Sequence, residues 1–342
     1  MSVKVKFLIV GFLLVLFLQR DVWAQGKPSL SEVDRIRLAE AFRLNENLSD
    51  DLWKDWSKVP FTVLLVASEH EFLIRHPKPS KDFASLGYDS LLKSEIYYRK
   101  RSFSTSLLAT FPAVGGVSTV VVGQAENTEA KTSTPWIVTL LHEHFHQLQD
   151  AQQNSFADVE ALNLSGGDRT GMWQINYAFP YETPEVARQL EKMSRQLAEV
   201  LQTEKKAARK TKLAEYLNAR RQLQTMLAAD DYKYFSFQLW KEGIARYTQF
   251  QAAKLALKKY KPSKAFRELK DFTSFKKVAD DLMSLMIREL TTLTMKEYKR
   301  VAFYPIGAAE GLLLDEANPN WRDRYFAEKF YVEKYFDPNK TR

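Results

Sequence analysis

The chain has 342 residues, and its 50 Lys and Arg against 42 Asp and Glu give a net charge of +8. It contains no cysteine, which excludes disulfides, thiolate metal ligands and lipidated cysteines. The modest basic charge comes without a zinc finger, a glycine-rich phosphate loop or an RNA-recognition motif, so a nucleic-acid partner is not expected.

The N-terminus has the pattern of a secretory signal peptide. Lys4 and Lys6 precede an apolar stretch over residues 7–18, and the segment 22–24 ends on the small residue Ala24. This pattern predicts a signal peptide over residues 1–24, with cleavage after Ala24. The apolar stretch is shorter than the roughly 20 residues that cross a bilayer, and no later stretch approaches that length. We therefore expect a periplasmic or secreted protein of bacterial type with no transmembrane segment after signal cleavage; an uncleaved N-terminal anchor is the alternative.

Residues 25–152 are predicted to form an N-terminal α+β lobe. Ser31 can cap a helix that runs to about residue 44. Short apolar runs separated by proline and glycine turn signals are typical of β-strands. These runs cover residues 61–66, 96–99, 107–111 and 117–122. A polar loop then leads to an apolar helix, for which Thr134 is the predicted N-cap and Pro135 the first residue.

Three of the five histidines lie together in this helix, in the sequence His142-Glu143-His144-Phe145-His146. A helix advances about 100° per residue, so His142 and His146 lie one turn apart on one face and can bind the same metal ion. Glu143 lies about 100° round the helix, where it can accept a proton from a zinc-bound water. This H-E-x-x-H pattern is the zinc-protease signature, and His144 faces the other way. Surface histidines on a structural helix are the alternative.

Residues 153–342 are predicted to form a mainly helical C-terminal lobe. Thr183 and Pro184 begin a long helical stretch that runs to about residue 229. Its basic face is either a solvated helical hairpin or a surface for acidic partners. Further helices are expected over residues 235–258, 274–290, 307–314 and 321–335. The aromatic loop 165–181 either lines a cleft or packs in the core.

A catalytic zinc ion usually has three protein ligands, so a third is needed beside the two histidines. His70 and His76 have the pattern of surface residues near the first strand. Gln149 and Gln152 stand where the extended metzincin motif requires glycine and histidine, which excludes that class.

Glu242 is the predicted third ligand, because Gly243 and the small residues after it would let their helix approach the metal closely. Glu310 and Asp150 are the alternatives, and Asp150 could instead orient an imidazole.

The segment 242–247 (EGIARY) resembles the Glu-Gly-(Leu/Ile)-Ala-x-(Tyr/Trp) segment that carries the third ligand in many gluzincins. Together with H-E-x-x-H, it makes the chain similar to the gluzincin zinc metallopeptidases, which include thermolysin-like and M1-type aminopeptidase domains. The resemblance implies an α+β, zincin-like fold. In that fold an N-terminal mixed β-sheet carries the active-site helix, and a mainly helical C-terminal lobe carries the third ligand.

Tyr304 begins a Y-x-x-G sequence that ends at Gly307 and is similar to one in M1-type enzymes. The resemblance implies that its hydroxyl stabilises the oxyanion of the tetrahedral intermediate; a packed tyrosine at a helix start is the alternative. Tyr247 lies about 140° round its helix from Glu242 and is predicted to pack in the core. Glu126 is a weaker candidate for binding a substrate amino group.

These residues predict an exported zinc-dependent peptidase, a hydrolase with Zn²⁺ as its cofactor and a peptide or protein as its substrate. Zinc-bound water attacks the peptide bond with Glu143 as general base. The substrate could pair with an edge of the sheet as an added strand. A catalytically inactive zincin-fold binding protein is the alternative, against which the intact Glu143 argues.

Overall fold

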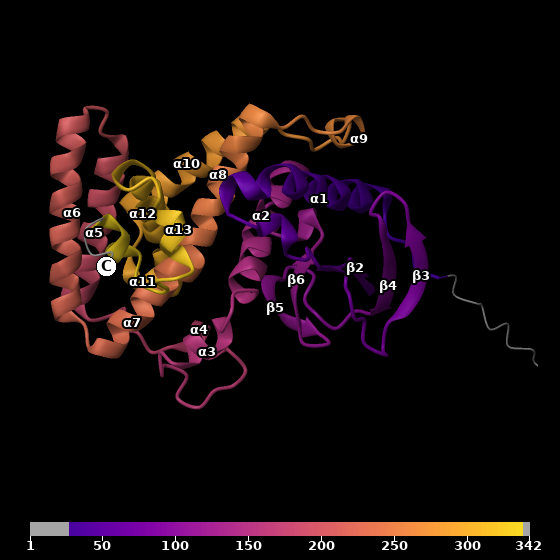
Figure 1. Cartoon of the computed structure of the whole chain (residues 1–342), viewed down its shortest axis with the longest axis horizontal. Helices are drawn as coiled ribbons and strands as arrows, with labels where there is room; N and C mark the ends of the chain where they lie inside the picture. Colours follow the sequence, from indigo (N-terminus) through magenta and orange to yellow (C-terminus); the bar gives the residue numbers. More distant parts are fainter. Residues whose placement is uncertain (1–26, 338–342) are drawn as a thin grey trace, which may run out of the picture.

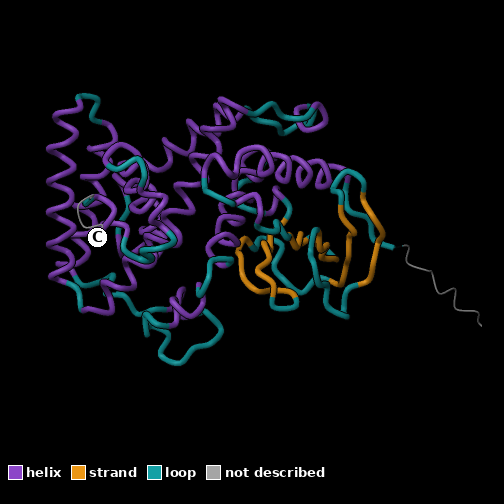
Figure 2. Tube along the Cα trace, in the orientation of Figure 1, coloured by secondary structure: helices purple, strands orange, loops and turns teal. Residues whose placement is uncertain are grey.

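A computed structural model describes residues 27–337, with a β-sheet at one end and a mainly helical region at the other (Figure 1). Figure 2 shows that the strands are confined to the end that also carries the N-terminal helices. The predicted α+β fold is confirmed, with His142 and His146 on a helix that follows the sheet. The predicted signal peptide, residues 1–24, lies outside the described residues. Between residues 27 and 337, no helix has the length and apolar character needed to span a membrane.

The sheet has six strands and is mixed. They are β1 (Val63–Val66), β2 (His70–Ile74), β3 (Ala84–Asp89), β4 (Ser94–Lys100), β5 (Leu108–Val114) and β6 (Val117–Gly123). Their order is β3-β4-β2-β1-β6-β5, in which β1 and β6 are parallel and every other pair is antiparallel. Four strands were predicted, while β2 and β3 were not. The edge strand β5 lies beside the helix that carries the histidines.

Side chains on β1 alternate between two apolar layers. Val63 and Leu65 belong to the main core, which includes α1 (Glu32–Leu52) and α2 (Ser133–Asp150). Leu64 and Val66 belong to a smaller cluster on the opposite face of the sheet. Because successive residues of a strand point to opposite faces, a continuous apolar run here indicates a strand that is covered on both sides.

Ser31 caps α1 as predicted, since its hydroxyl accepts a hydrogen bond from the Asp34 amide at 3.1 Å. The helix continues to Leu52, about two turns beyond the expected end. The predicted cap of α2 was wrong, because the helix begins at Ser133 and Thr132 occupies the N-cap position. The hydroxyl of Thr134 instead accepts a hydrogen bond from the Thr273 amide at 3.1 Å.

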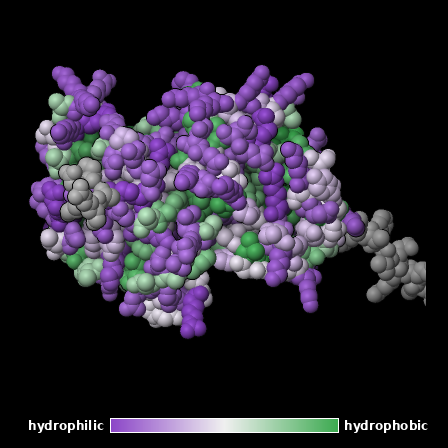
Figure 3. Space-filling model, in the orientation of Figure 1, coloured by the Kyte–Doolittle hydropathy of each residue, from purple (hydrophilic) through white to green (hydrophobic). Residues whose placement is uncertain are grey.

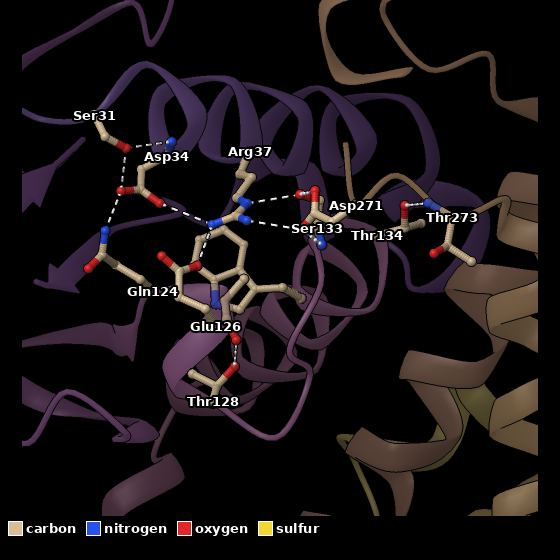
Figure 4. A network of polar contacts seen from close by, with 12 residues as sticks. Ser31, Asp34, Arg37, Gln124, Glu126, Thr128, Ser133, Thr134, Asp271 and Thr273 are labelled. Atoms are coloured by element: carbon tan, nitrogen blue, oxygen red, sulfur yellow. Dashed lines mark hydrogen bonds and ion pairs between the residues drawn. The ribbon is translucent and has the colours of Figure 1, made fainter. Parts of the chain in front are cut away.

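A buried arginine ties α1 to the start of α2 (Figure 4). Arg37 forms ion pairs with Asp34, Glu126 and Asp271 at 2.8–3.3 Å. Asp271 also accepts a hydrogen bond from the Ser133 amide at 2.9 Å. A carboxylate at a helix N-terminus is favourable because it satisfies a free amide and complements the helix dipole. This network holds the start of the helix that carries the histidines.

From α2 to residue 337 the structure is mainly helical, as predicted. The longer helices are α5 (Pro184–Gln202), α6 (Lys206–Met226), α7 (Ala229–Gln238), α8 (Ile244–Lys259), α10 (Phe275–Thr292) and α12 (Phe303–Ala317). The short helices are α3 (Ser155–Glu160), α4 (Trp173–Asn176), α9 (Lys264–Arg267), α11 (Met295–Tyr298) and α13 (Trp321–Tyr325). Single helical turns form η1 (Trp56–Lys58), η2 (Ala125–Asn127), η3 (Leu239–Gly243), η4 (Lys299–Ala302) and η5 (Val332–Phe336). The helix predicted over residues 321–335 is therefore broken into α13 and η5.

The basic hairpin consists of α5 and α6, which pack together. Lys205, Lys206 and Lys210 are exposed at its tip, where hydrophilic side chains project in Figure 3. Not every basic residue of this stretch is solvated, because Arg220 of α6 is buried. Its Nε donates a hydrogen bond to Glu310 Oε1 at 2.6 Å, which anchors α6 to α12.

Candidate metal centre

The helix α2 is buried along almost its whole length because it packs between β5, β6 and the helices α1 and α8. His142 and His146 occupy one face of it, one turn apart. Both side chains are buried, and their ring centroids are 5.0 Å apart. His144 lies on another face, where its ring stacks on Phe61 with centroids 4.0 Å apart. The prediction that His144 points away from the other two histidines is confirmed.

Glu242 completes the group from a distant part of the chain. It lies in η3, a π-helical turn between α7 and α8, in which the Ile244 amide bonds to the Leu239 carbonyl. Glu242 Oε2 is 3.4 Å from His146 Nε2 and 3.9 Å from His142 Nε2. One ligand atom from each of the three residues lies within 4.8 Å of the others. Single π-helical turns are frequent at functional sites.

The three side chains fit a zinc ion. Two imidazoles and a carboxylate are a common catalytic zinc donor set, and a tetrahedral ion with bonds of about 2.0–2.1 Å places its ligands about 3.3 Å apart. Burial lowers the pKa of His142 to about 3, so this imidazole is neutral and able to bind a metal. Burial alone would raise the pKa of Glu242, but the neighbouring His146 and Arg300 charges lower it, so the carboxylate is ionised.

His146 is held in the orientation that a metal ligand needs. Gln149 Oε1 lies 2.7 Å from His146 Nδ1, so the ring can donate its Nδ1 hydrogen and present Nε2 toward Glu242. Gln149 Nε2 donates to the carbonyl of Lys241 at 3.1 Å and to the Tyr325 hydroxyl at 2.7 Å. One amide therefore connects His146 with the π-helical turn that carries Glu242.

A close helix crossing places the second half of the site. A Cβ atom on Gly243 would lie 2.5 Å from Gly307 Cα, and a Cβ on Gly307 would lie 2.7 Å from Gly243 Cα. The predicted reason for Gly243 was approach to the metal. The structure shows instead that it allows α12 to approach η3. Tyr304, one turn before Gly307, is thereby carried to the metal centre.

Glu143 lies beside the two histidines with its side chain buried. The Thr110 hydroxyl of β5 lies 2.8 Å from Glu143 Oε2 and 3.0 Å from the Glu143 carbonyl, so it can donate to either oxygen. Burial raises the pKa of Glu143, although the positive charge of His146 opposes the shift. A carboxylate whose pKa moves toward neutrality is suited to accept and return a proton.

Tyr304 lies near His142, and Arg300 lies near Glu242. The Tyr304 ring lies roughly parallel to that of His142, with centroids 6.5 Å apart. Arg300 Nη1 donates a hydrogen bond to the Tyr304 hydroxyl at 2.7 Å and lies 3.5 Å from Glu242 Oε1. Burial and the negative charge of Glu242 raise the pKa of Tyr304 well above its ordinary value, so the phenol keeps its proton. Sequence reasoning did not find Arg300; its spacing of four residues before Tyr304 was the available signal.

The other sequence candidates are engaged elsewhere. The Glu310 carboxylate accepts hydrogen bonds from Tyr216 and Arg220. Asp150 accepts one from Ser118 at 2.6 Å, so it does not orient an imidazole. Glu126 pairs with Arg37 in the network of Figure 4.

His76, expected at the surface, is buried, and its Nε2 lies 3.2 Å from the Val114 carbonyl.

Comparison with known proteins found no matching protein family, no matching curated sequence and no matching solved structure. The feature that relates this chain to zincins is therefore the buried group of His142, His146 and Glu242, which is consistent with an H-E-x-x-H…E site.

Proposed function

We propose that this protein is an exported zinc-dependent peptidase. The observation that carries the proposal is the convergence of His142, His146 and Glu242 next to the buried carboxylate of Glu143. A zinc ion, when held by the three ligands, polarises a scissile carbonyl and lowers the pKa of a water molecule.

Glu143 accepts the proton of the attacking water and passes it to the leaving amine. The Thr110 hydroxyl holds one carboxylate oxygen of Glu143. The Tyr304 hydroxyl accepts a hydrogen bond from Arg300 and keeps its own hydrogen, which it would donate to the oxyanion.

The edge strand β5 offers a place for an extended peptide. Among residues 27–337 it pairs with β6 on one side only, and its Thr110 contacts Glu143 directly. A peptide added as a strand would therefore lie with its backbone next to Glu143. Pro112 has no amide hydrogen, so added-strand pairing is expected over the part of β5 that precedes it.

Cleavage of a denatured proteome tests the proposal. The protein without residues 1–24 should produce new peptide termini, and a chelator should abolish them. Glu143→Gln should retain zinc and the fold and lose turnover by several orders of magnitude, because the base and the proton shuttle are both removed. An absence of zinc-dependent cuts, with retention of a protein partner, would instead support an inactive binding protein of zincin fold.

Export is the second part of the proposal, and it is supported by the charged and apolar pattern of residues 1–24. Sequencing of the exported protein should give Gln25 as its first residue. Recovery of the full-length chain in a membrane pellet would contradict cleavage.

A further inference from the structure

An open cavity of about 590 Å³ lies near the start of α12. Its lining includes Phe179 and Tyr181 from the loop before α5, and Lys299 of η4. Phe179 and Tyr181 pack on Phe303, the first residue of α12, with centroids 5.3 and 6.0 Å away. The next residue, Tyr304, faces the metal centre. The aromatic loop thus both packs in the core and lines a cavity, and Phe303 connects its rings with Tyr304, which stacks near His142.

Two successive cations connect the cavity with the metal centre, because Lys299 lines the cavity and Arg300 contacts Tyr304 and Glu242. The exposed side chain of Lys299 lines the cavity, and its backbone has φ 45° and ψ −127°. A residue with a Cβ rarely adopts a positive φ, and such strain is retained mainly where it positions a functional group. With this backbone conformation the Lys299 side chain lines the cavity. The next residue, Arg300, contacts Tyr304 and Glu242.

Arg300 has hydrogen-bonding capacity left for a ligand. Its contacts with Tyr304 and Glu242 both use Nη1. Within residues 27–337, Nε and Nη2 have no hydrogen-bond partner, and the side chain is 21% exposed. Its charge also reaches the cavity: burial raises the pKa of Tyr181 to about 12, and the charge of Arg300 acts against that shift.

The charges around the centre favour a negatively charged ligand. Glu143 and Glu242 supply two negative charges, which a divalent zinc ion balances. The positive charges of Lys299 and Arg300 then remain in excess. Lys241 adds a third positive charge near the centre, which acts to lower the pKa of Glu143 against the effect of burial. Glu182 is the only acidic residue in the cavity lining among the described residues, and it opposes this effect in part.

We propose that Lys299 and Arg300 form a subsite that binds a carboxylate of the substrate close to the scissile bond. The inference rests on the proposed peptidase function. A guanidinium group binds a carboxylate through two parallel hydrogen bonds, and Lys299 supplies a second, mobile charge. The carboxylate of a peptide has two sources, its free C-terminus and an Asp or Glu side chain, and the test must distinguish them.

Binding of matched peptides to the full chain carrying Glu143→Gln, loaded with zinc, is the direct test. One fluorescent peptide ends in a free acid and its twin in an amide, and a second, amidated pair has an internal Asp or Asn. We expect the charged member of at least one pair to bind about tenfold more tightly, as for one charge-assisted hydrogen bond. A preference for the free acid identifies recognition of a C-terminus, and a preference for Asp identifies recognition of a side chain.

Single replacements locate the effect. Lys299→Asn suits a positive φ and leaves the metal ligands untouched, and it should reduce the preference, as should Arg300→Gln. The matched control is Lys296→Asn, an exposed lysine three residues earlier, which should leave the preference unchanged. Glu182→Gln should increase it. If Arg300→Gln loses zinc, Lys299→Asn alone decides the question.

Equal affinity for the charged and uncharged peptides would overturn the subsite, and so would a preference that survives both Lys299→Asn and Arg300→Gln. Cleavage of the same four peptides by the unmodified protein separates this inference from the proposed function. Cleavage without any charge preference would leave the peptidase standing and remove the subsite. Charge-dependent binding without cleavage would support the subsite and contradict the peptidase function.

Discussion

The crossing of Gly243 and Gly307 makes a sharp test of how the metal centre is assembled. In Gly307→Ala, the new Cβ would lie 2.7 Å from Gly243 Cα and 2.7 Å from the Leu239 carbonyl oxygen. Non-bonded carbon atoms pack at about 3.5–4.0 Å, so α12 and η3 must separate by about 1 Å.

Two opposing effects set the stability of this variant. Alanine stabilises a helix interior by about 1 kcal/mol relative to glycine. Overpacking destabilises a core by about 1–3 kcal/mol, so we expect a net loss of about 1–2 kcal/mol in the free energy of unfolding. The effect on rate is larger, because Tyr304 and Glu242 lie on the two elements that separate. A displacement of about 1 Å at reacting groups lowers kcat by about 100-fold.

Gly311→Ala is the matched control on the same helix. Its Cβ would lie 2.7 Å from Tyr247 Cδ2, a core ring whose hydroxyl bonds to Asp315. We expect a similar loss of stability in urea unfolding but a kcat near that of the unmodified protein. Unchanged kcat and stability in Gly307→Ala would refute the close crossing. An equal loss of kcat in Gly311→Ala would show that the effect on rate is not local.

The remaining predictions concern the metal and the oxyanion. Gln149→Leu should lower zinc affinity by about 10- to 100-fold in chelator competition, because the His146 ring loses its orienting acceptor. His146→Ala should strip the roughly one zinc ion per chain that a three-ligand site holds. His144→Ala should keep the zinc and lower the free energy of unfolding by about 2–4 kcal/mol, as a truncated core side chain does. Tyr304→Phe should lower kcat by about 100-fold with KM and zinc content little changed, whereas Tyr247→Phe should reduce stability more than rate. A loss of rate in Tyr247→Phe together with an unchanged rate in Tyr304→Phe would assign the oxyanion role to Tyr247 instead.

Local helix geometry explains why part of the site was predictable. The spacing of His142 and His146 places both imidazoles on one face in any α-helix. The same geometry places Gln149, three residues after His146, within reach of the His146 ring. From the sequence, Gln149 was used only as evidence against metzincins. Glu242 is separated from the histidines by a long stretch of chain, so no periodicity connects them. It was predicted from the small residues that follow it and from the resemblance of its segment to gluzincins.

Tertiary contacts explain what the sequence did not reveal. The strand β2 contains Glu71, whose buried carboxylate accepts hydrogen bonds from Arg99 and from the amides of Ser102 and Phe103. Its partners come from another strand and a loop, so the local pattern looked polar. His76 was misjudged for the same reason, because its acceptor is the carbonyl of Val114 on β5.

The π-helical turn has a consequence for how such a site can be gained or lost. From Ala229 to Lys259 the chain is one helical rod, and the extra residue in η3 offsets the register of its two halves. Loss of a single codon in η3 would restore a regular α-helix and turn one half by about 100° relative to the other. With α7 and α8 each held by its own packing, Glu242 could no longer face the histidines. The sequence would still contain every ligand residue, but the metal centre would not form without the one extra residue in η3.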